Sequence, residues 1–422
     1  MNNIQKKINL FKSSEKTIKN NTKNEIDKIK YIKRGTKKFN EVLLALFSGG
    51  LATFAILYCV QPMLPVFSIN FNLTPAQSSL SLSSATAMMA IGMLITGPLS
   101  DFIGRKILMS FSLISASIFT ILCSQMTSWN EIILMRSLTG LSLSGVAAVA
   151  MTYLSEEIHP SILSFSIGLY ISGNAIGGFS GRLIAGILST KFSWNIALLI
   201  IGSISFISSL FFLWLLPNSK NFKSITLNSH TLISNFFIHL NDKYLSKLFM
   251  MGFILMGSFV TLFNYIGYRL TSYPFSLNQS MIGLLSVVYL TGTYSSPKAG
   301  ILTNKYHRSN VLIGSLLLMI SGLIITEFNN LIIIIPGLML FSAGFFAAHS
   351  VSSSWIGHRV KIAKGQASSL YLFFYYLGSS IFGTFGGIFW FAWRWLGISI
   401  FIIFMLSLGI LLAHKLKLSS ND

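Results

Sequence analysis

Charged residues are scarce in this chain of 422 residues. Asp, Glu, Lys and Arg together make up 10% of the sequence, whereas hydrophobic residues make up 52%. Soluble domains contain about 25% charged residues, so this composition excludes an ordinary soluble protein and indicates a membrane protein. None of the 11 acidic residues lies in the middle of an apolar run. A proton relay made of buried carboxylates is therefore not expected.

Cysteine is also rare. Cys59 and Cys123 are the two thiols, and both lie inside apolar runs. They exclude a disulfide framework, and we interpret them as small packing residues rather than redox or metal-binding groups. The sequence also lacks the G-x-S-x-G, H-E-x-x-H and P-loop motifs. It therefore predicts no enzyme, no cofactor, no metal site and no ATP-driven machine.

The net charge of +20 comes from basic residues in an N-terminal tail and in the links between apolar runs. They form no basic stripe on a soluble domain, so a nucleic-acid partner is not expected. Residues 1–40 are rich in Lys, Asn and Ile without periodicity, and we expect a disordered tail there. Contact of this tail with an anionic membrane surface stays an open alternative. The tail is too long and too polar for a signal peptide, so the first apolar run is expected to remain as a span.

Twelve apolar runs are long enough to cross a bilayer, which takes about 20 residues. Their approximate bounds are 42–65, 79–98, 107–126, 131–154, 162–188, 195–216, 248–269, 280–297, 309–326, 331–352, 366–389 and 395–414. If the N-terminus is cytoplasmic, 26 of the 31 Lys and Arg residues fall on the cytoplasmic side of these runs. Such an excess is the positive-inside pattern. The sequence thus predicts a multi-pass protein of the lipid bilayer with both termini in the cytoplasm.

The longest link between runs divides them into two sets of six. We expect a cytoplasmic tail over 1–40, a bundle over 41–216, a cytoplasmic linker over 217–247, a second bundle over 248–414 and a short tail over 415–422. Two matching stretches support a duplication. They are Gly97-Pro-Leu-Ser-Asp-Phe-Ile-Gly-Arg105 and Gly300-Ile-Leu-Thr-Asn-Lys-Tyr-His-Arg308, which are 203 positions apart.

The first stretch resembles the cytoplasmic signature of the major facilitator superfamily, approximately G-x-L-a-D-R-x-G-R-K between spans two and three. The matching residues are Gly97, Leu99, Asp101, Gly104, Arg105 and Lys106. The resemblance implies an all-α membrane protein with twelve transmembrane helices in two pseudo-symmetric six-helix bundles. It also implies a solute transporter.

Arg136-Ser-Leu-Thr-Gly140 in span four is similar to the R-x-x-Q-G element of this superfamily. The glycine-rich Gly173-Asn-Ala-Ile-Gly-Gly-Phe-Ser-Gly-Arg182 in span five resembles an element of the superfamily's drug:proton antiporter branch. Together with Gln61-Pro-Met-Leu-Pro65 and Asn264-Tyr-Ile-Gly-Tyr268, the start of the span-five stretch is most similar to the YnfM-type inner-membrane transporters of bacteria. A bacterial inner membrane is the location that this implies.

The signature stretch contains an Asp and an Arg four residues apart, which share a helix face if the second span continues. Arg105 is expected to reach Glu156 or Glu157 at the inner end of span four. We interpret these groups as a conformational latch whose contacts differ between the two access states. The alternative is that Arg105 and Lys106 only anchor the span at the cytoplasmic side.

Polar residues inside the spans are candidates for a solute pathway. Gln61 and Asn264 are 203 positions apart, the offset of the repeat, and are expected to face each other across a central cavity. The alternative is that both amides only join neighbouring helices. The predicted pathway consists of Tyr58, Gln61, Arg136, Asn174, Arg182, Asn264, Tyr265, Tyr268, Phe374 and Tyr375.

Ionisable groups at membrane depth are functional candidates by default. For Arg136 the alternatives are a pathway role and snorkelling to the interface. For Arg182 they are binding of an anion or carbonyl and a structural contact. His349 is a candidate proton site, because its reference pKa is about 6.5, and a packed histidine is the alternative. Asp101 with Glu156 and Glu157 is the other candidate for a proton site.

The sequence therefore predicts a secondary transporter that exports a small solute in exchange for protons and works as a monomer. Uptake or uniport of a nutrient or metabolite is the first alternative. A membrane sensor that has lost transport is the second, but it would require a folded output domain that the short tail and linker do not provide.

Overall fold

The computed structural model describes residues 31–222, 229–360 and 364–418. Within these ranges the chain is helical apart from turns, short links and one isolated bridge between Ile32 and Ile158. The predicted tail lies outside the described residues up to position 30, as do parts of the predicted linker and C-terminal tail.

The first half begins with a broken span and continues with five long helices. The broken span consists of α2 (Lys37–Tyr58), the 3₁₀ turn η1 (Gln61–Met63) and α3 (Leu64–Asn70). The helices after it are α4 (Pro75–Ile103), α5 (Arg105–Cys123), α6 (Trp129–Glu157), α7 (Pro160–Lys191) and α8 (Trp194–Leu215).

The second half repeats this order after the short helix α9 (Ser229–Asn241). Its elements are α10 (Lys243–Thr271), a span made of α11 (Gln279–Leu284), η2 (Leu285–Leu290) and α12 (Thr291–Leu302), then α13 (Arg308–Ile325), α14 (Leu331–Arg359) and α15 (Lys364–Leu418). The backbone of α15 leaves the helical conformation at Trp393 and Arg394, so α15 contains two spans.

Ten helices in the described part of the chain are long and apolar enough to cross a membrane. The segmented span α11–η2–α12 and the second part of α15 raise the number of crossings to twelve. The all-α fold with twelve membrane-crossing helices is confirmed.

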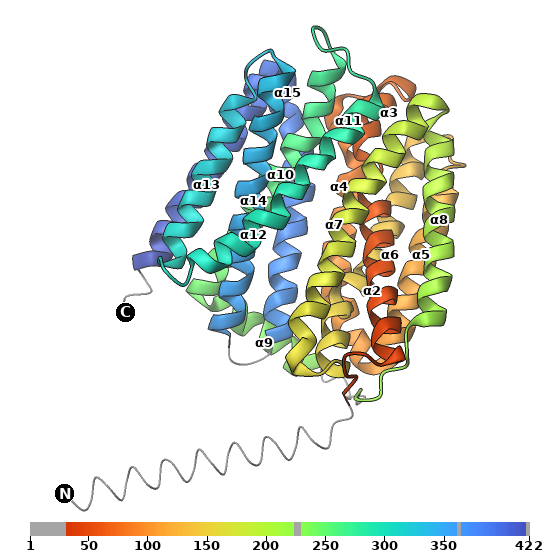
Figure 1. Ribbon diagram of the computed structural model, residues 1–422. Helices are drawn as coiled ribbons and strands as arrows, with labels where there is room; N and C mark the ends of the chain where they lie inside the picture. Colours follow the sequence, from red (N-terminus) through yellow and green to blue (C-terminus); the bar gives the residue numbers. More distant parts are fainter. Residues whose placement is uncertain (1–30, 223–228, 361–363, 419–422) are drawn as a thin grey trace, which may run out of the picture.

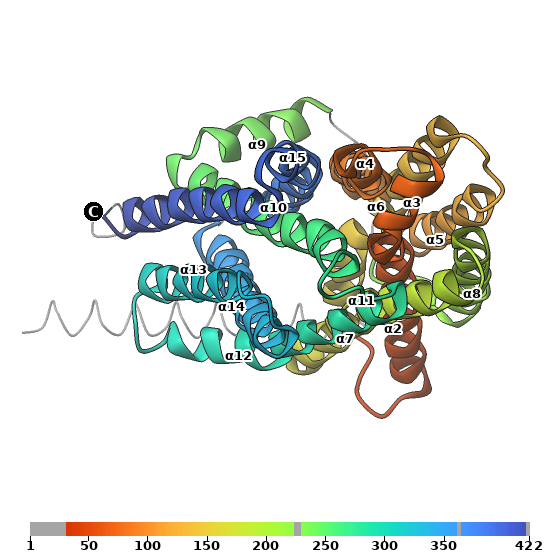
Figure 2. The same ribbon diagram turned by 90° about the horizontal axis from the view of Figure 1, so that it is seen from above.

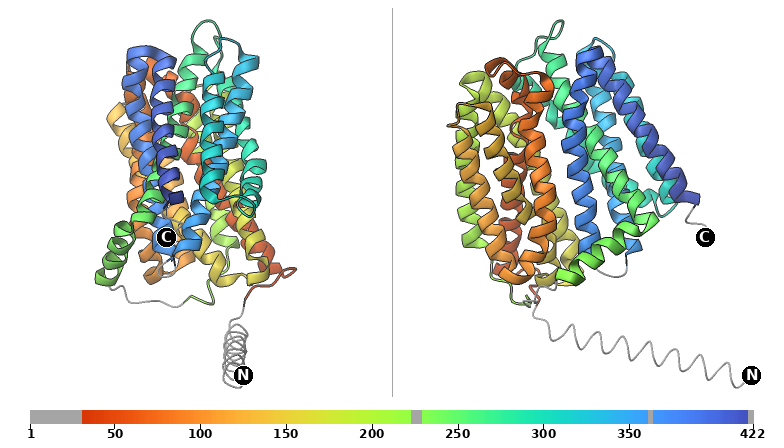
Figure 3. Two further views of the ribbon diagram at one scale, coloured as in Figure 1. Left: turned by 90° about the vertical axis from the view of Figure 1, so that its left-hand side faces the viewer. Right: turned by 180° about the vertical axis from the view of Figure 1, so that it is seen from behind.

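The helices form two bundles that stand side by side, as Figure 1 and the view from above in Figure 2 show. The start of α2 and the end of α15 lie on the same side, the lower side in Figure 1. We call this side the tail face and the opposite side the far face. Figure 3 shows α9, in green, along the tail face.

Local sequence signals explain where α4 and α6 begin. The Thr74 hydroxyl accepts a hydrogen bond from the backbone N–H of Gln77, whose side chain accepts one in return from the backbone N–H of Thr74. Ser128 and Glu131 form the same reciprocal capping box before α6. Each box satisfies two backbone donors that have no partner inside the helix.

The buried core joins the two halves unevenly. One continuous cluster contains residues of both halves, among them Leu64 and Phe67 of the first half and Phe263 of the second. Toward the tail face each half has a separate cluster, which includes Tyr153 in the first half and Trp355 in the second. The buried residues of the two halves therefore form one shared core toward the far face and two separate cores toward the tail face, where Leu94 of α4 still packs against the core of the second half.

Two segments differ from the sequence prediction. Residues 31–40 are ordered, because the Ile32 backbone pairs with Glu157 and His159 and α2 already begins at Lys37. The predicted linker over 217–247 contains α9 and the first turn of α10. Their hydrophobic residues lie in short stretches beside lysines, so a search for runs of 20 apolar residues does not find them.

Candidate functional site

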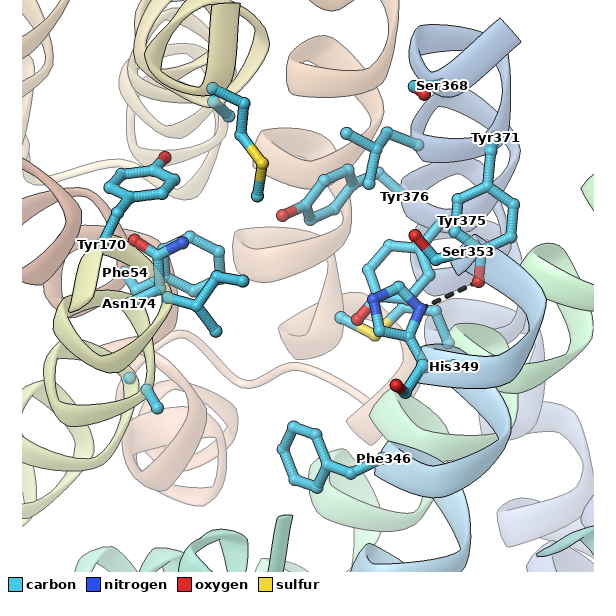
Figure 4. A pocket seen from close by; sticks show the side chains of 18 of the residues that line it. Phe54, Tyr170, Asn174, Phe346, His349, Ser353, Ser368, Tyr371, Tyr375 and Tyr376 are labelled. Carbon is cyan, nitrogen blue, oxygen red and sulfur yellow. Dashed lines mark hydrogen bonds between the residues drawn. The ribbon is translucent and has the colours of Figure 1, made fainter. Parts of the chain in front are cut away.

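A cavity of about 750 Å³ lies between the two halves. Figure 4 shows Phe54, Tyr170 and Asn174 on one wall and His349, Ser353 and Tyr375 on the other. The first wall belongs to α2 and α7, and the second to α14 and α15. Because each wall comes from a different half, any relative movement of the halves changes the shape of this cavity.

The lining of the cavity is mainly aromatic and apolar. No Asp or Glu lines it among the described residues, and Arg182 is the one permanent charge there. The aromatic residues of the lining are Phe54, Tyr58, Tyr170, Phe259, Tyr289, Phe345, Phe346, Tyr371, Tyr375 and Tyr376. Such a lining with a few polar groups is typical of a binding site for a small organic molecule.

Arg182 lies toward the far end of the cavity and is 5% exposed. Its guanidinium is stacked between two rings, with its central carbon 4.2 Å from the ring centre of Tyr58 and 4.6 Å from that of Tyr289. Nη1 donates a hydrogen bond to the carbonyl of Gly178, one turn earlier in α7 (2.6 Å). Nε donates to Oε1 of Gln61 (2.6 Å). Four contacts thus hold the charge in one orientation.

Gln61 links Arg182 to the second half. Arg182 can only donate, so Gln61 turns its oxygen toward the guanidinium and its nitrogen away. The Nε2 of Gln61 donates to Oδ1 of Asn264 (2.8 Å). Tyr268 adds a second connection, since its hydroxyl donates to the carbonyl of Leu64 (2.9 Å) and lies 2.7 Å from the hydroxyl of Ser68. We call these contacts of Gln61 and Tyr268 the far-face bridge.

The prediction that Gln61 and Asn264 face each other is confirmed by their hydrogen bond, but the cavity does not lie between them. Gln61 is 4% exposed and Asn264 is 1% exposed. Both belong to the packed layer that closes the cavity toward the far face. The offset of 203 residues could predict that Gln61 and Asn264 meet. It could not predict that they meet in this packed layer, because that depends on how far the halves tilt toward each other.

The cavity extends toward the tail face. Thr152 and Ser155 line it near the end of α6, Ser354 near the end of α14, and Gly365 and Ser368 at the start of α15. These helix ends lie on the tail face, where the cores of the two halves are separate. The cavity is therefore closed at the far face and reaches the tail face.

His349 lines the wall formed by the second half. Its Nδ1 is 2.8 Å from the hydroxyl of Tyr371, the contact that is dashed in Figure 4. Its ring centre is 4.8 Å from that of Tyr375. Tyr371 belongs to α15, the helix that follows α14 in the sequence. The geometry leaves His349 both a hydrogen-bond partner and access to the cavity.

Arg136 does not line the cavity, in contrast to the prediction. It is fully buried, and it donates hydrogen bonds to the backbone carbonyls of Ser81 (2.9 Å), Ile56 (3.0 Å) and Leu57 (2.7 Å). The last two carbonyls belong to the final turn of α2, where the helix breaks before Pro62. A guanidinium supplies five donors, and here it satisfies acceptors that the break leaves without intrahelical partners.

Three other predicted pathway residues also lie away from the cavity. The Tyr265 hydroxyl donates to the carbonyl of Gly383 (3.0 Å), and Phe374 stacks on Phe249 with ring centres 5.8 Å apart. Tyr268 belongs to the far-face bridge. Their side chains pack between neighbouring helices instead. A sequence pattern does not distinguish the helix face toward the cavity from the face toward a neighbouring helix. Of the ten predicted residues, the lining contains Tyr58, Asn174, Arg182 and Tyr375.

The signature stretch forms a charged cluster on the tail face of the first half. Nη2 of Arg105 lies 2.6 Å from Oδ1 of Asp101 and 2.8 Å from Oε1 of Glu156. Nη1 of Arg105 donates to the hydroxyl of Ser100. We call these four residues the Arg105 cluster. The pair with Glu156 was one of the two alternatives predicted from position. The pair with Asp101 forms across the helix break at Gly104, whereas the prediction required a continuous second span.

Gly104 separates α4 from α5 at this cluster, and its φ of 104° is a conformation that glycine adopts without strain. Glu157 points elsewhere, because its Oε1 accepts a hydrogen bond from the backbone N–H of Asn221 (2.8 Å). Glu157 therefore ties α6 to the segment after α8 and is not part of the cluster. Leu99 packs against the tail-face core of the first half.

Comparison with known families matches residues 46–275 of this chain to the Major Facilitator Superfamily. This is more than half of the sequence. The chain belongs to the major facilitator superfamily. Proteins of this superfamily are membrane transporters and not enzymes, so the chain is a transporter that works on a solute within a lipid bilayer.

Two relatives and one solved structure agree with this assignment. The chain is 65% identical over 401 residues to a transporter of Buchnera aphidicola subsp. Acyrthosiphon pisum, covering 95% of this chain and 98% of the relative. It is 60% identical over 386 residues to the inner membrane transport protein YnfM of Escherichia coli, covering 92% and 93%. It is also similar in fold to an inward-facing, occupied bacterial homologue of the human lysosomal transporter Spinster. There the TM-score is 0.71 at 14% identity, covering 92% of this chain and 98% of that one.

The predicted resemblance to YnfM-type transporters is confirmed by the second relative. This chain is a multi-pass membrane protein, and that relative is an inner-membrane protein by name. Within the superfamily fold, the cavity contains tyrosines that the sequence prediction missed, namely Tyr170, Tyr289, Tyr371 and Tyr376. Tyr371 and Tyr375 are four residues apart, so their shared helix face was a usable signal.

Proposed function

We propose that this transporter moves a small solute by alternating access, and that the conformation described here is the one open to the tail face. The observation that supports this most directly is the asymmetry of the cavity. Its far end is closed by hydrogen bonds between the halves, whereas its tail-face end lies between separate cores. Opening toward the far face requires the far-face bridge to break.

The tail face is the cytoplasmic side in this proposal. The basic residues that surround the helix ends there support it, because an excess of Lys and Arg marks cytoplasmic loops. Arg105 and Lys106 are the first residues of α5, Lys305 lies between α12 and α13, and Arg308 is the first residue of α13. The protein then lies in a bacterial inner membrane, and its cavity opens to the cytoplasm. One chain contains both halves and the whole cavity, which supports a monomer.

The transporter exports its solute in exchange for protons in this proposal. This exchange is supported by the resemblance to the drug:proton antiporter branch and by the position of His349. An imidazole is the side chain whose ordinary pKa is close to physiological pH. His349 lines the cavity, and no carboxylate does so among the described residues. Solute and proton would therefore meet in one chamber.

The Arg105 cluster serves as the cytoplasmic latch in this proposal. Asp101 is one-third exposed and lies on α4, which packs along α15 of the other half. A β-carbon placed on Gly97, one turn before Asp101, would lie 4.0 Å from the hydroxyl of Ser369 on α15. Closing the tail face would bring α15 still closer to Asp101, so its carboxylate could exchange Arg105 for groups of the second half.

A ligand screen followed by transport tests the function. The purified protein is screened by thermal shift, and each ligand that binds is assayed for counterflow in proteoliposomes with and without a pH gradient. We expect a pH gradient to drive transport. We expect His349→Asn to abolish the stimulation of transport by the gradient, while counterflow without a gradient persists. His414→Asn is the matched control, because His414 is exposed on α15 away from the cavity. If the counterflow rate of the native protein is the same with and without a pH gradient, proton exchange is refuted and uniport is supported.

A further inference from the structure

The far end of the cavity contains a buried cation without a counter-ion. Arg182 is 5% exposed, and no carboxylate of the described residues forms an ion pair with it. Of the two other strongly buried arginines, Arg105 has two carboxylates beside it, and three nitrogens of Arg136 donate to backbone carbonyls. Burying a charge without an opposite charge is unfavourable. A site that keeps such a group at a cavity wall is suited to a ligand that brings the missing charge.

The guanidinium of Arg182 also has donors left over. It has five N–H groups, of which one on Nε and one on Nη1 are used by Gln61 and Gly178. Nη2 has no hydrogen-bond acceptor among the described residues. The central carbon of the guanidinium lies over the rings of Tyr58 and Tyr289, and the N–H groups without an acceptor point outward in the plane of the group. A planar acceptor in the same plane as the guanidinium is the partner that fits these N–H groups.

The rest of the cavity determines what that acceptor is attached to. Between Arg182 and the tail face the cavity walls contain Phe54, Phe259, Phe345 and other aromatic rings, and the described residues of these walls include no acidic side chain. An aromatic or apolar body would be covered by these rings, whereas an organic cation would find no opposite charge and would be repelled by Arg182.

We propose that the solute is a small carboxylate with an aromatic or apolar body, and that its carboxylate pairs with Arg182. This inference rests on the proposed function, because it assumes that the cavity is the solute site. Hydrogen bonds to charged groups are worth about 1.5–3 kcal/mol. The carboxylate should therefore bind about 10-fold to 100-fold tighter than a neutral molecule of the same shape.

Three probes of matched shape test this proposal: 2-naphthoate, 2-naphthamide and 2-naphthylmethylamine. Binding to the purified full-length protein in nanodiscs is measured by calorimetry at pH 7.5. We expect the carboxylate to bind at least 10-fold tighter than the amide, and the amine to bind least. Equal affinities for the carboxylate and the amide, or no binding of the carboxylate, would overturn the proposal.

Two variants test the role of Arg182 itself. Arg182→Gln removes the charge and should remove the preference for the carboxylate over the amide. Gln61→Glu keeps Arg182 but adds an internal carboxylate at the atom that already accepts from Nε, so it should also remove the preference. Arg394→Gln is the matched control, because Arg394 is exposed and lies outside the cavity lining, and this variant should retain the preference. If Arg182→Gln keeps the 10-fold preference, another group recognises the anion and the proposal is wrong.

The transport assay separates this inference from the proposed function. Counterflow of the neutral amide at the same rate as the carboxylate would support a transporter and refute the carboxylate preference. Carboxylate binding without counterflow would support the site and refute transport through this cavity.

Discussion

The far-face bridge should control which side of the membrane the cavity opens to. Asn264→Leu removes the acceptor of Gln61 with little change in volume, and Tyr268→Phe removes a hydroxyl that contacts Leu64 and Ser68. All of these bonds join the two halves. Both substitutions should therefore destabilise the far-closed state selectively, because the bonds do not exist once the halves separate there.

The magnitude follows from the number of bonds. A buried hydrogen bond contributes about 1 kcal/mol net in proteins, and side-chain bonds between membrane helices contribute about 0.6 kcal/mol on average. Asn264→Leu removes one bond and should raise the ratio of far-open to far-closed molecules about 3-fold to 5-fold, whereas Tyr268→Phe removes two and should raise it about 8-fold to 30-fold. The double variant should raise the ratio about 20-fold to 150-fold if the two effects are additive.

Spin labels on the far face can measure this shift. Thr127→Cys lies between α5 and α6, and Phe328→Cys lies between α13 and α14, both at exposed positions. The buried thiols Cys59 and Cys123 are first replaced by Ala. Double electron–electron resonance in nanodiscs should show a longer distance between the labels in a larger fraction of the double variant.

A control on the same helix separates this effect from a general loss of stability. Thr261→Val removes a buried hydroxyl of α10 whose hydrogen bond goes to the carbonyl of Gly257 in the same helix (2.7 Å). It should leave the label distances unchanged. If the double variant also leaves them unchanged while it remains folded, the far-face bridge does not hold the halves together, and the reasoning fails.

Three further predictions concern the first half. Asp101→Asn should weaken the Arg105 cluster by about 1 kcal/mol and change the inward-to-outward ratio about fivefold, measured with labels on the tail face; an unchanged ratio would exclude a latch. Arg136→Gln should lower the melting temperature strongly, because it leaves buried carbonyls unsatisfied at about 1–3 kcal/mol each, whereas the carboxylate preference of the remaining folded protein should persist. Gly140→Ala should also lower the melting temperature, since its β-carbon would lie 1.9 Å from the carbonyl oxygen of Ala85, while Gly168→Ala, which meets no atom within 4 Å, should not.

The sequence could predict features that depend on spacing along one element or on the repeat. Run length and basic links predicted twelve spans in two sets of six. Position in the second and fourth spans predicted that Arg105 would reach Glu156 or Glu157, and the structure contains the pair with Glu156. The 203-residue offset predicted the contact of Gln61 with Asn264. Helical periodicity and duplication are properties of the chain itself, so they can be read without knowing how the helices pack.

Only the tertiary structure decided which polar groups meet the cavity. Arg136 and Arg182 are both arginines in spans of the same half, yet one binds two backbone carbonyls at the break of α2 and one of α4, and the other lies at the cavity wall between two tyrosines. The difference depends on where α2 breaks, how α7 packs against α2, and how the halves lean together at the far face. Those are contacts between elements far apart in the sequence, and they determine which donors are already satisfied and which remain free for a solute.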